Sequence, residues 1–350
     1  MRESLIQIGL SRLSSIRDRA KELVLKDIKE NTLLDELSRF TDKLMNLDRS
    51  SFTDFQKREL CYDIEIAIGW FNALIDNENT RLSKSILELL KQISRDWIDT
   101  YDNRVFLVTV GDYATQARAK ELNDRFGKEY HFSFTMLPLI LYVPPHLSDD
   151  LFLGVALLHE IGHMIDFELD ISYLVEYLIK SGKTPIRISD ADCSPYFSDL
   201  KSIDRSHLEE YFADIFGAQY SGESILANVD YRTVYPTQSS MTHPSYENRL
   251  SAVSDFVKNN STKNYSSKII TLMAFVMEVF KNKPLRIQTV TIDESSFDND
   301  EPIQFSSPAQ LSSIFYNSWA AFEKGPHTFD RYARINSIAL RSLDNHFGVS

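Results

Sequence analysis

Residues 148–169 read SDDLFLGVALLHEIGHMIDFEL, and this segment predicts a helix from which the rest of the chain can be interpreted. Ser148 is a good N-cap residue, and Asp149 and Asp150 would lie in the first turn, where the helix dipole favours negative charge. The apolar residues that follow are typical of a buried helix. We therefore expect a helix over residues 148–168.

Within this helix, residues 159–163 read HEIGH, which is the pattern H-E-x-x-H. Positions i and i+4 lie on the same face of a helix, so His159 and His163 can bind one Zn²⁺ at ~2.0–2.1 Å each. Glu160 would lie beside the open coordination position and take a proton from water as a general base. Gly162 is a small residue next to the ligands. The alternative is two buried histidines bonded to backbone carbonyls.

Residues 206–220, SHLEEYFADIFGAQY, predict a second helix with a third ligand. Ser206 and Glu209 have the spacing of a capping box, which would occupy Glu209 at the helix start. Glu210 lies on a face of small and polar residues that can approach the first helix, and it would complete a His₂Glu site with an open fourth position. Asp214, one turn on, can orient a ligand histidine. Glu209 is the competing candidate for the third ligand. The alternative to the roles of Glu210 and Asp214 is that both lie on a solvated acidic face of the helix.

A third segment, residues 242–250, reads THPSYENRL. It predicts a helix start, with Pro244 at the first helical position and Thr242 or His243 near the cap. Taken in order, H-E-x-x-H, E-x-x-A-D and H-P-x-x-x-x-R resemble the gluzincin zinc peptidases that include the CAAX prenyl proteases and the bacterial heat-shock membrane peptidase. The resemblance covers residues 148–250.

This resemblance implies a metalloendopeptidase that uses Zn²⁺ to hydrolyse peptide bonds. Tyr211 and Tyr246 are further candidates for a hydrogen bond to the oxyanion. The roles that the resemblance implies are zinc ligation by His159, His163 and Glu210, general base catalysis by Glu160, stabilisation of the tetrahedral intermediate by His243, and support of the site by Asp214 and Arg249.

Charge and composition limit the partners and the compartment. The 38 Lys and Arg against 50 Asp and Glu give a net charge of −12, which argues against a general nucleic-acid binder. Members of the resembled family are usually membrane proteins, yet no stretch here reaches ~18 consecutive apolar residues, and the first residues lack a secretory signal. The two cysteines, Cys61 and Cys193, are expected to be reduced thiols. We expect a soluble, cytoplasmic protein that acts on a protein or peptide substrate.

Apolar periodicity predicts a mainly helical α+β protein. The resemblance implies a zincin-like core, in which a small sheet packs on the active-site helix. We divide the chain into a helical N-terminal region (1–100), the metallopeptidase core (101–260) and a mostly helical C-terminal region (261–350). Beyond the segments above, helices are expected at residues 172–181, 244–258, 266–282, 307–323 and 328–345.

Branched and aromatic residues predict strands at residues 105–110 and 132–143. Pro138 cannot donate to a ladder, which favours an edge position or a break in the second strand. An extended peptide substrate could then bind along that edge through backbone hydrogen bonds. Residues 285–292, LRIQTVTI, also alternate like a strand.

Two other functions fit the same motifs. The chain could be a regulatory or interaction protein whose zincin core cleaves or binds one specific partner, recognised by the helical ends. It could also be a zinc hydrolase that acts on a non-peptide amide. Cleavage of unfolded proteins and mass analysis of the products would distinguish these alternatives from a general peptidase.

Overall fold

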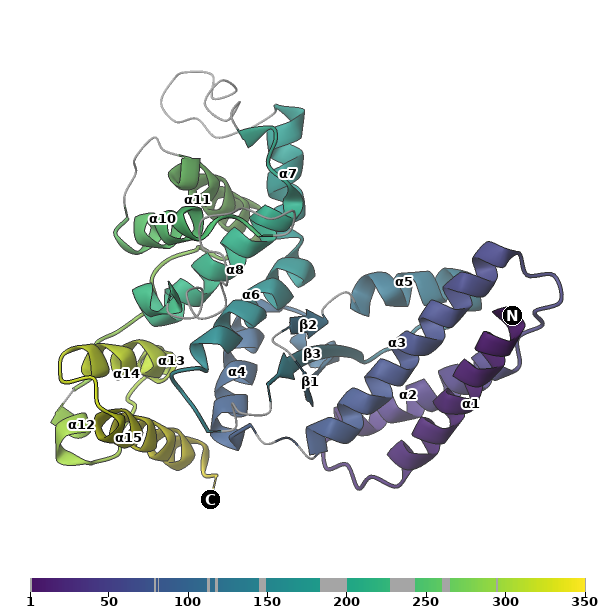
Figure 1. Cartoon of the computed structure of the whole chain (residues 1–350), viewed down its shortest axis with the longest axis horizontal. Helices are drawn as coiled ribbons and strands as arrows, with labels where there is room; N and C mark the ends of the chain where they lie inside the picture. The colour runs from purple at the N-terminus through teal and green to yellow at the C-terminus, as the bar shows by residue number, and fades with distance from the viewer. Residues whose placement is uncertain are drawn as a thin grey trace. The chain divides into compact units, whose positions relative to one another are not determined.

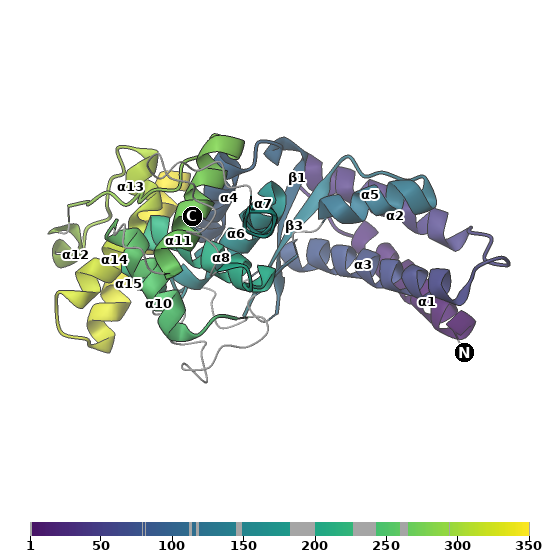
Figure 2. The same ribbon diagram turned by 90° about the horizontal axis from the view of Figure 1, so that it is seen from above.

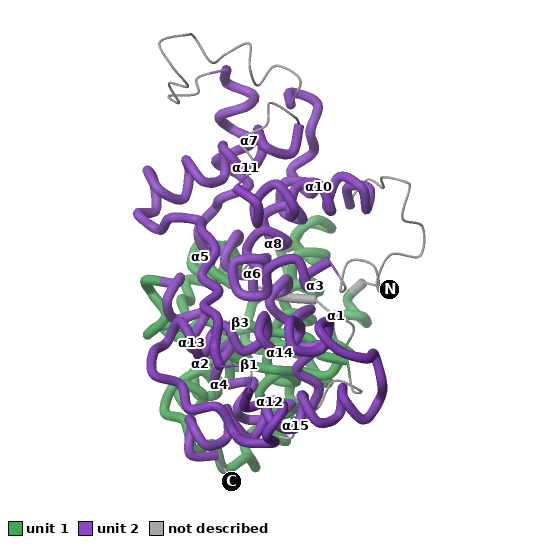
Figure 3. The backbone as a smooth tube through the Cα atoms, turned by 90° about the vertical axis from the view of Figure 1, so that its left-hand side faces the viewer, with its two compact units in different colours: residues 1–81, 99–145 green, residues 82–98, 146–350 purple. Residues whose placement is uncertain are grey.

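The computed structural model describes residues 2–78, 80, 82–111, 114–116, 119–144, 149–182, 200–226, 243–259, 265–293 and 295–349. The chain forms two compact units, shown in different colours in Figure 3. Unit 1 comprises residues 1–81 and 99–145, and unit 2 comprises residues 82–98 and 146–350. The predicted division at residues 100 and 260 stays a prediction, and the two units divide the chain at other positions.

Unit 1 combines long helices with a small sheet (Figure 1). Helix α3 packs against α1, α2 and the first strand of the sheet. The α1–α3 contact is close because Gly9 offers no side chain: a Cβ there would lie 3.1 Å from the Ile64 side chain. The helices of this unit are α1 (Arg2–Lys21), α2 (Ile28–Met45), α3 (Asp54–Glu78), α5 (Ala119–Tyr130) and the 3₁₀ turn η1 (Tyr101–Asn103).

The sheet of unit 1 has the order β1-β3-β2. Strand β3 (Leu137–Val143) pairs in parallel with β1 (Arg104–Val110) and antiparallel with β2 (Ala114–Gln116). The predicted edge position of residues 132–143 is therefore wrong, because β3 is the central strand. Pro138 pairs opposite Val105 and lies outside the part of β3 that β2 covers. A substrate cannot add to β3 where β2 already occupies its edge.

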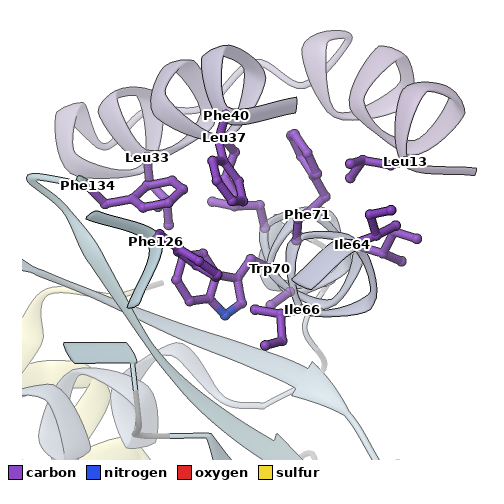
Figure 4. Close-up of a cluster of buried hydrophobic side chains, with 14 of the residues drawn as sticks. Leu13, Leu33, Leu37, Phe40, Ile64, Ile66, Trp70, Phe71, Phe126 and Phe134 are labelled. Carbon is purple, nitrogen blue, oxygen red and sulfur yellow. The ribbon is translucent and has the colours of Figure 1, made fainter. Parts of the chain in front are cut away.

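The core of unit 1 is rich in aromatic rings, and Figure 4 shows it between the helices and the sheet. The Phe40 ring lies 4.7 Å from the Phe126 ring, and the Trp70 ring lies 5.2 Å from the Phe134 ring, measured between centroids. Aromatic pairs at such distances add to the stabilisation that burial of their surface provides. Trp70 is therefore a core residue.

All the regular elements that the structure describes in unit 2 are helices. The expected helices of this region are confirmed, although the one at residues 307–323 is divided at Ser313. None of the described helices is long and apolar enough to cross a membrane. The elements are α4 (Lys84–Trp97), α6 (Val155–Leu169), α7 (Ile171–Ser181), α8 (Arg205–Ser221), η3 (Gly222–Ser224), α10 (Tyr246–Val257), α11 (Tyr265–Phe275), the π-helix η4 (Val276–Phe280), α12 (Ser295–Asn299), α13 (Pro308–Ser312), α14 (Ile314–Glu323) and α15 (Phe329–Phe347).

Helix α6 begins seven residues later than residue 148, the position predicted from the sequence, at Val155. The residues before it form a turn, in which Asp150 Oδ1 accepts a hydrogen bond from Leu153 N at 3.0 Å. The Phe152 ring fixes this turn by packing 5.2 Å from the Trp319 ring. Ser148, the predicted cap, lies outside the described residues.

Residues 285–292 do not form the expected strand: the segment is extended, but no strand of the described chain pairs with it. Side chains of α14 and of the residue before it accept its backbone hydrogen bonds instead. Val290 N donates to Ser313 Oγ at 2.8 Å, and Ile292 N donates to Asn317 Oδ1 at 3.1 Å. The mainly helical α+β class is thus confirmed. The packing of the sheet on the active-site helix stays a prediction, because β1–β3 belong to unit 1 and α6 to unit 2.

Candidate metal centre

The site is built where α6 and α8 pack side by side (Figures 1 and 2). Glycines allow the two backbones to approach closely. A Cβ on Gly162 would lie 2.6 Å from Ala213 Cα, and a Cβ on Gly217 would lie 3.6 Å from His159 N. The small-residue face predicted for the second helix therefore does contact the first. This contact brings the histidines of α6 to the carboxylates of α8.

Three potential ligand atoms converge at this crossing. His159 Nε2 lies 3.1 Å from His163 Nε2 and 3.6 Å from Glu210 Oε2, and His163 Nε2 lies 3.4 Å from Glu210 Oε1. Ligands ~2.0–2.1 Å from a tetrahedral zinc ion lie about 3.3–3.4 Å from one another. Within the described residues, this is the one group of three or more His, Cys, Asp or Glu whose donor atoms are close enough to share a metal.

Glu210 provides a test of whether the site fits a cation. Its Oε2 atom is buried and has no hydrogen-bond partner, although Arg249 Nη2 lies 3.4 Å away. Burial alone would raise the pKa of this carboxyl, but the hydrogen bond from His163 and the neighbouring positive charges lower it far below its usual value. An ionised carboxylate oxygen without a hydrogen bond is costly in the interior. A bound zinc ion would satisfy it, so the donor set fits zinc.

Asp214 holds one of the histidines in place. Its Oδ1 atom lies 3.0 Å from His159 Nδ1 and accepts a hydrogen bond from Arg249 Nη2 at 2.7 Å, while its Oδ2 atom accepts one from Arg249 Nε at 2.6 Å. Burial would raise the pKa of Asp214, but the Arg249 charge lowers it, so the carboxyl is ionised. An ionised carboxylate only accepts, so the His159 proton lies on Nδ1. The lone pair of Nε2 then faces the centre, as ligation requires.

Glu160 and His243 lie at the same centre but differ in exposure. Glu160 is buried, and its charge acts on the neighbouring His163 imidazole. Burial favours the neutral form of His163, yet the hydrogen bond to Glu210 and the surrounding carboxylates raise its pKa. His243 Nε2 lies 3.4 Å from Glu210 Oε1, and its side chain is 57% exposed. His243 therefore lies on the side of the centre that is open to solvent.

Glu209, the competing ligand, has a different environment. It pairs with Arg205, whose Nε atom lies 3.8 Å from Glu209 Oε1, and it is not part of the converging group. The predicted capping box is wrong, because α8 begins at Arg205 with Asp204 at the cap position, and Ser206 lies inside the first turn. The structure brings Glu210, not Glu209, to the histidines.

Helix α10 presents Arg249 to the site. Its cap is Ser245, whose Oγ accepts a hydrogen bond from Asn248 N at 3.4 Å, so Pro244 precedes the helix and is not its first residue. Thr242 lies outside the described residues, as does Cys193. Of the two tyrosines considered for the oxyanion, Tyr211 is buried, and burial raises its pKa.

One buried acid of α6 did not enter the sequence-based prediction. Asp166 Oδ1 accepts a hydrogen bond from Ser172 N at 2.7 Å and so joins α6 to the start of α7. Burial raises the pKa of Asp166 to about 6. Asp166 lies one turn after His163 on the same face of α6. This position could have indicated from the sequence that Asp166 helps to fix the helix that carries the two histidines.

Comparison with models of protein families finds no match to this chain. Searches among curated proteins and among solved structures also find no match. The resemblance to the gluzincins therefore stays an expectation from the three sequence motifs.

Proposed function

We propose that the chain is a zinc-dependent metallopeptidase whose metal is held by His159, His163 and Glu210. The observation that carries the proposal is the convergence of donor atoms from three residues: the two Nε2 atoms lie 3.1 Å apart, and each lies 3.4 to 3.6 Å from one of the two Glu210 oxygens, close to the edge length of a tetrahedral zinc site. The buried Glu210 oxygen that lacks a hydrogen bond and the orienting contact from Asp214 support it.

A bound zinc ion would supply Lewis acidity, activating water and polarising a substrate carbonyl. The protein supplies the proton transfers. Glu160, next to a ligand on the same helix, would accept a proton from the attacking water and pass it to the leaving amine. His243, exposed beside Glu210, would donate a hydrogen bond to the oxygen of the carbonyl as negative charge develops on it.

Metal analysis combined with one substitution tests this proposal. We expect one zinc per chain in the purified protein and in the Glu160→Gln variant, because Glu160 is not among the converging ligand atoms. We expect the wild type to cleave unfolded casein and the variant to lose that activity. A protein without stoichiometric zinc would end the metal assignment, and a fully active variant would remove Glu160 from the role of base. Zinc without any cleavage of casein would instead favour a protein that acts on one specific partner.

A further inference from the structure

Residues 285–292 of unit 2 form an extended segment that lies outside the metal centre. Its first half is bonded to the end of α8. Arg286 N donates to Gln219 Oε1 at 3.1 Å, and Gln288 N donates to the backbone oxygen of Gln219 at 2.9 Å. Carbonyls in the last turn of a helix have no partner within the helix. The segment therefore completes the hydrogen bonding of α8.

The second half is bonded to side chains of α14 and of the residue before it. Val290 N donates to Ser313 Oγ at 2.8 Å, Ile292 N donates to Asn317 Oδ1 at 3.1 Å, and Asn317 Nδ2 donates to Val290 O at 2.9 Å. Ser313 and Asn317 are fully buried, as is Gln219. Buried polar side chains matched to backbone groups fix the segment in one register.

The opposite edge of the segment is unpaired within the part of the chain that the structure describes. In an extended chain, the backbone groups of successive residues point to opposite edges. The even-numbered residues from 286 to 292 point to the helices, so Ile287, Thr289 and Thr291 point their N–H and C=O groups away from them. No backbone group of these three bonds to any residue that the structure describes. Such an edge can accept another extended chain.

The distribution of charge along the segment indicates which chain would pair with this edge. Lys281 and Lys283 precede the segment and Arg286 lies near its start, whereas Asp293 follows it directly and more acidic residues come after. An antiparallel pair of two identical segments would place each basic end beside the acidic end of the other. We propose that the outward edge of residues 285–292 pairs with the same edge of a second copy of this chain across a two-fold axis.

The three residues whose backbone groups point outward determine the register in which the two copies would pair. Antiparallel pairing that uses all three places Thr289 opposite itself and Ile287 opposite Thr291, giving about six interchain hydrogen bonds. The self-paired position is unique to a two-fold arrangement, so it can be tested directly.

The first test is the mass of the full-length protein in solution, measured by light scattering over a range of concentrations. We expect a dimer that dissociates on dilution. Thr289→Pro removes the outward N–H without touching the inward bonds of residues 288 and 290, and we expect it to weaken association roughly tenfold or more. Thr289→Ala keeps the N–H and should remain dimeric. A wild type that is monomeric throughout, or a Thr289→Pro variant that dimerises like the wild type, would overturn the proposal.

The second test locates the axis by disulfide cross-linking and does not depend on the folding of a proline variant. Under mild oxidation, Thr289→Cys should give a covalent dimer, since opposite Cα atoms in a bonded antiparallel pair are ~5.5 Å apart. Thr291→Cys should not, because it faces Ile287. The wild type controls for the native cysteines. Equal cross-linking at both positions, or none at Thr289→Cys, would show that the proposed pair does not form.

Discussion

Two adjacent glutamates of α8 differ in what surrounds their carboxylates. Glu210 contacts both histidines of α6, whereas Glu209 pairs with Arg205. Loss of a ligand removes a metal bond, while loss of Glu209 removes an ion pair that is partly exposed. We expect Glu210→Ala to lower zinc affinity by about two orders of magnitude or more and Glu209→Ala to leave it nearly unchanged. Competition with a chromophoric chelator measures both, and the reverse order would make Glu209 the ligand.

Asp214 would act on a bound zinc ion only through His159, which would make it a positioning residue. Asp214→Asn keeps the size of the side chain but removes the charge that pairs with Arg249 and fixes the imidazole proton on Nδ1. We expect a loss of about 10–100-fold in zinc affinity by chelator competition. Asp255→Asn is the matched control, since Asp255 is also buried in unit 2 but accepts a hydrogen bond from Ser266. Equal losses in the two variants would mean a general effect of burying an amide.

The residues of the candidate site could be named from the sequence because helical spacing fixes them locally. The i, i+4 spacing of His159 and His163 requires only that residues 155–169 be helical, which holds although the helix starts later than predicted. The predicted N-cap residues were wrong, since several residues near each helix start could act as the cap. Ser245 rather than His243 caps α10, which leaves the His243 side chain exposed beside Glu210.

Between elements, the site depends on how closely α6 approaches α8. In Gly162→Ala, the new Cβ would lie 2.6 Å from the Cα of Ala213, and a backbone atom cannot move aside cheaply. We expect the helices to separate, with a loss of about 1–3 kcal/mol in unfolding free energy and weaker zinc binding. Chemical denaturation with and without zinc measures both effects.

Gly69→Ala in α3 is the control for this substitution. A Cβ at Gly69 would meet no atom within 4 Å, so alanine there should only restrict the unfolded chain and favour the helix. We expect a gain of about 0.4–1 kcal/mol in unfolding free energy. If the two variants changed stability in the same direction by similar amounts, the close approach at Gly162 would not matter.

Elements that depend on partners far away in the sequence were predicted less well. Residues 285–292 have the alternation of a strand, but Ser313 and Asn317 supply their hydrogen bonds in place of a neighbouring strand. Pro138 indicated an edge, yet β2 pairs with only part of β3 and leaves Pro138 outside that ladder. A local pattern shows that a segment is extended, whereas its neighbours follow from tertiary packing.

At the scale of the whole molecule, the sequence could not predict to which of the two units α4 belongs. Its apolar face predicts burial but not against which helices. In the structure it contacts α6 and α15 of unit 2. Trp97 Nε1 donates to Tyr220 Oη at 2.5 Å, and the Trp97 ring lies 5.4 Å from the Phe216 ring. Through these contacts, residues 82–98 belong with the metal centre and not with the helices that precede them.

Asp63, in unit 1, should make the stability of the protein vary with pH. Burial raises the pKa of Asp63 to about 6, although Tyr130 Oη donates to it at 2.6 Å and Arg125 also bonds to it. The folded pKa lies above the ordinary value of 3.8, so the folded chain binds more protons than the unfolded chain between these values. The contribution to stability is complete below the ordinary pKa and is lost as the pH rises through about 6.

We therefore expect the unfolding free energy of the wild type, relative to Asp63→Asn, to fall between pH 4.5 and pH 7 by an amount on the order of 1–3 kcal/mol. Asparagine cannot ionise, so the variant removes this titration and keeps the size of the side chain. Urea unfolding followed by circular dichroism at each pH measures the difference, and Asp42→Asn, at an exposed position on α2, controls for the loss of an acidic group. A difference that stayed constant or rose over this range would show that burial does not hold the Asp63 proton in the folded unit.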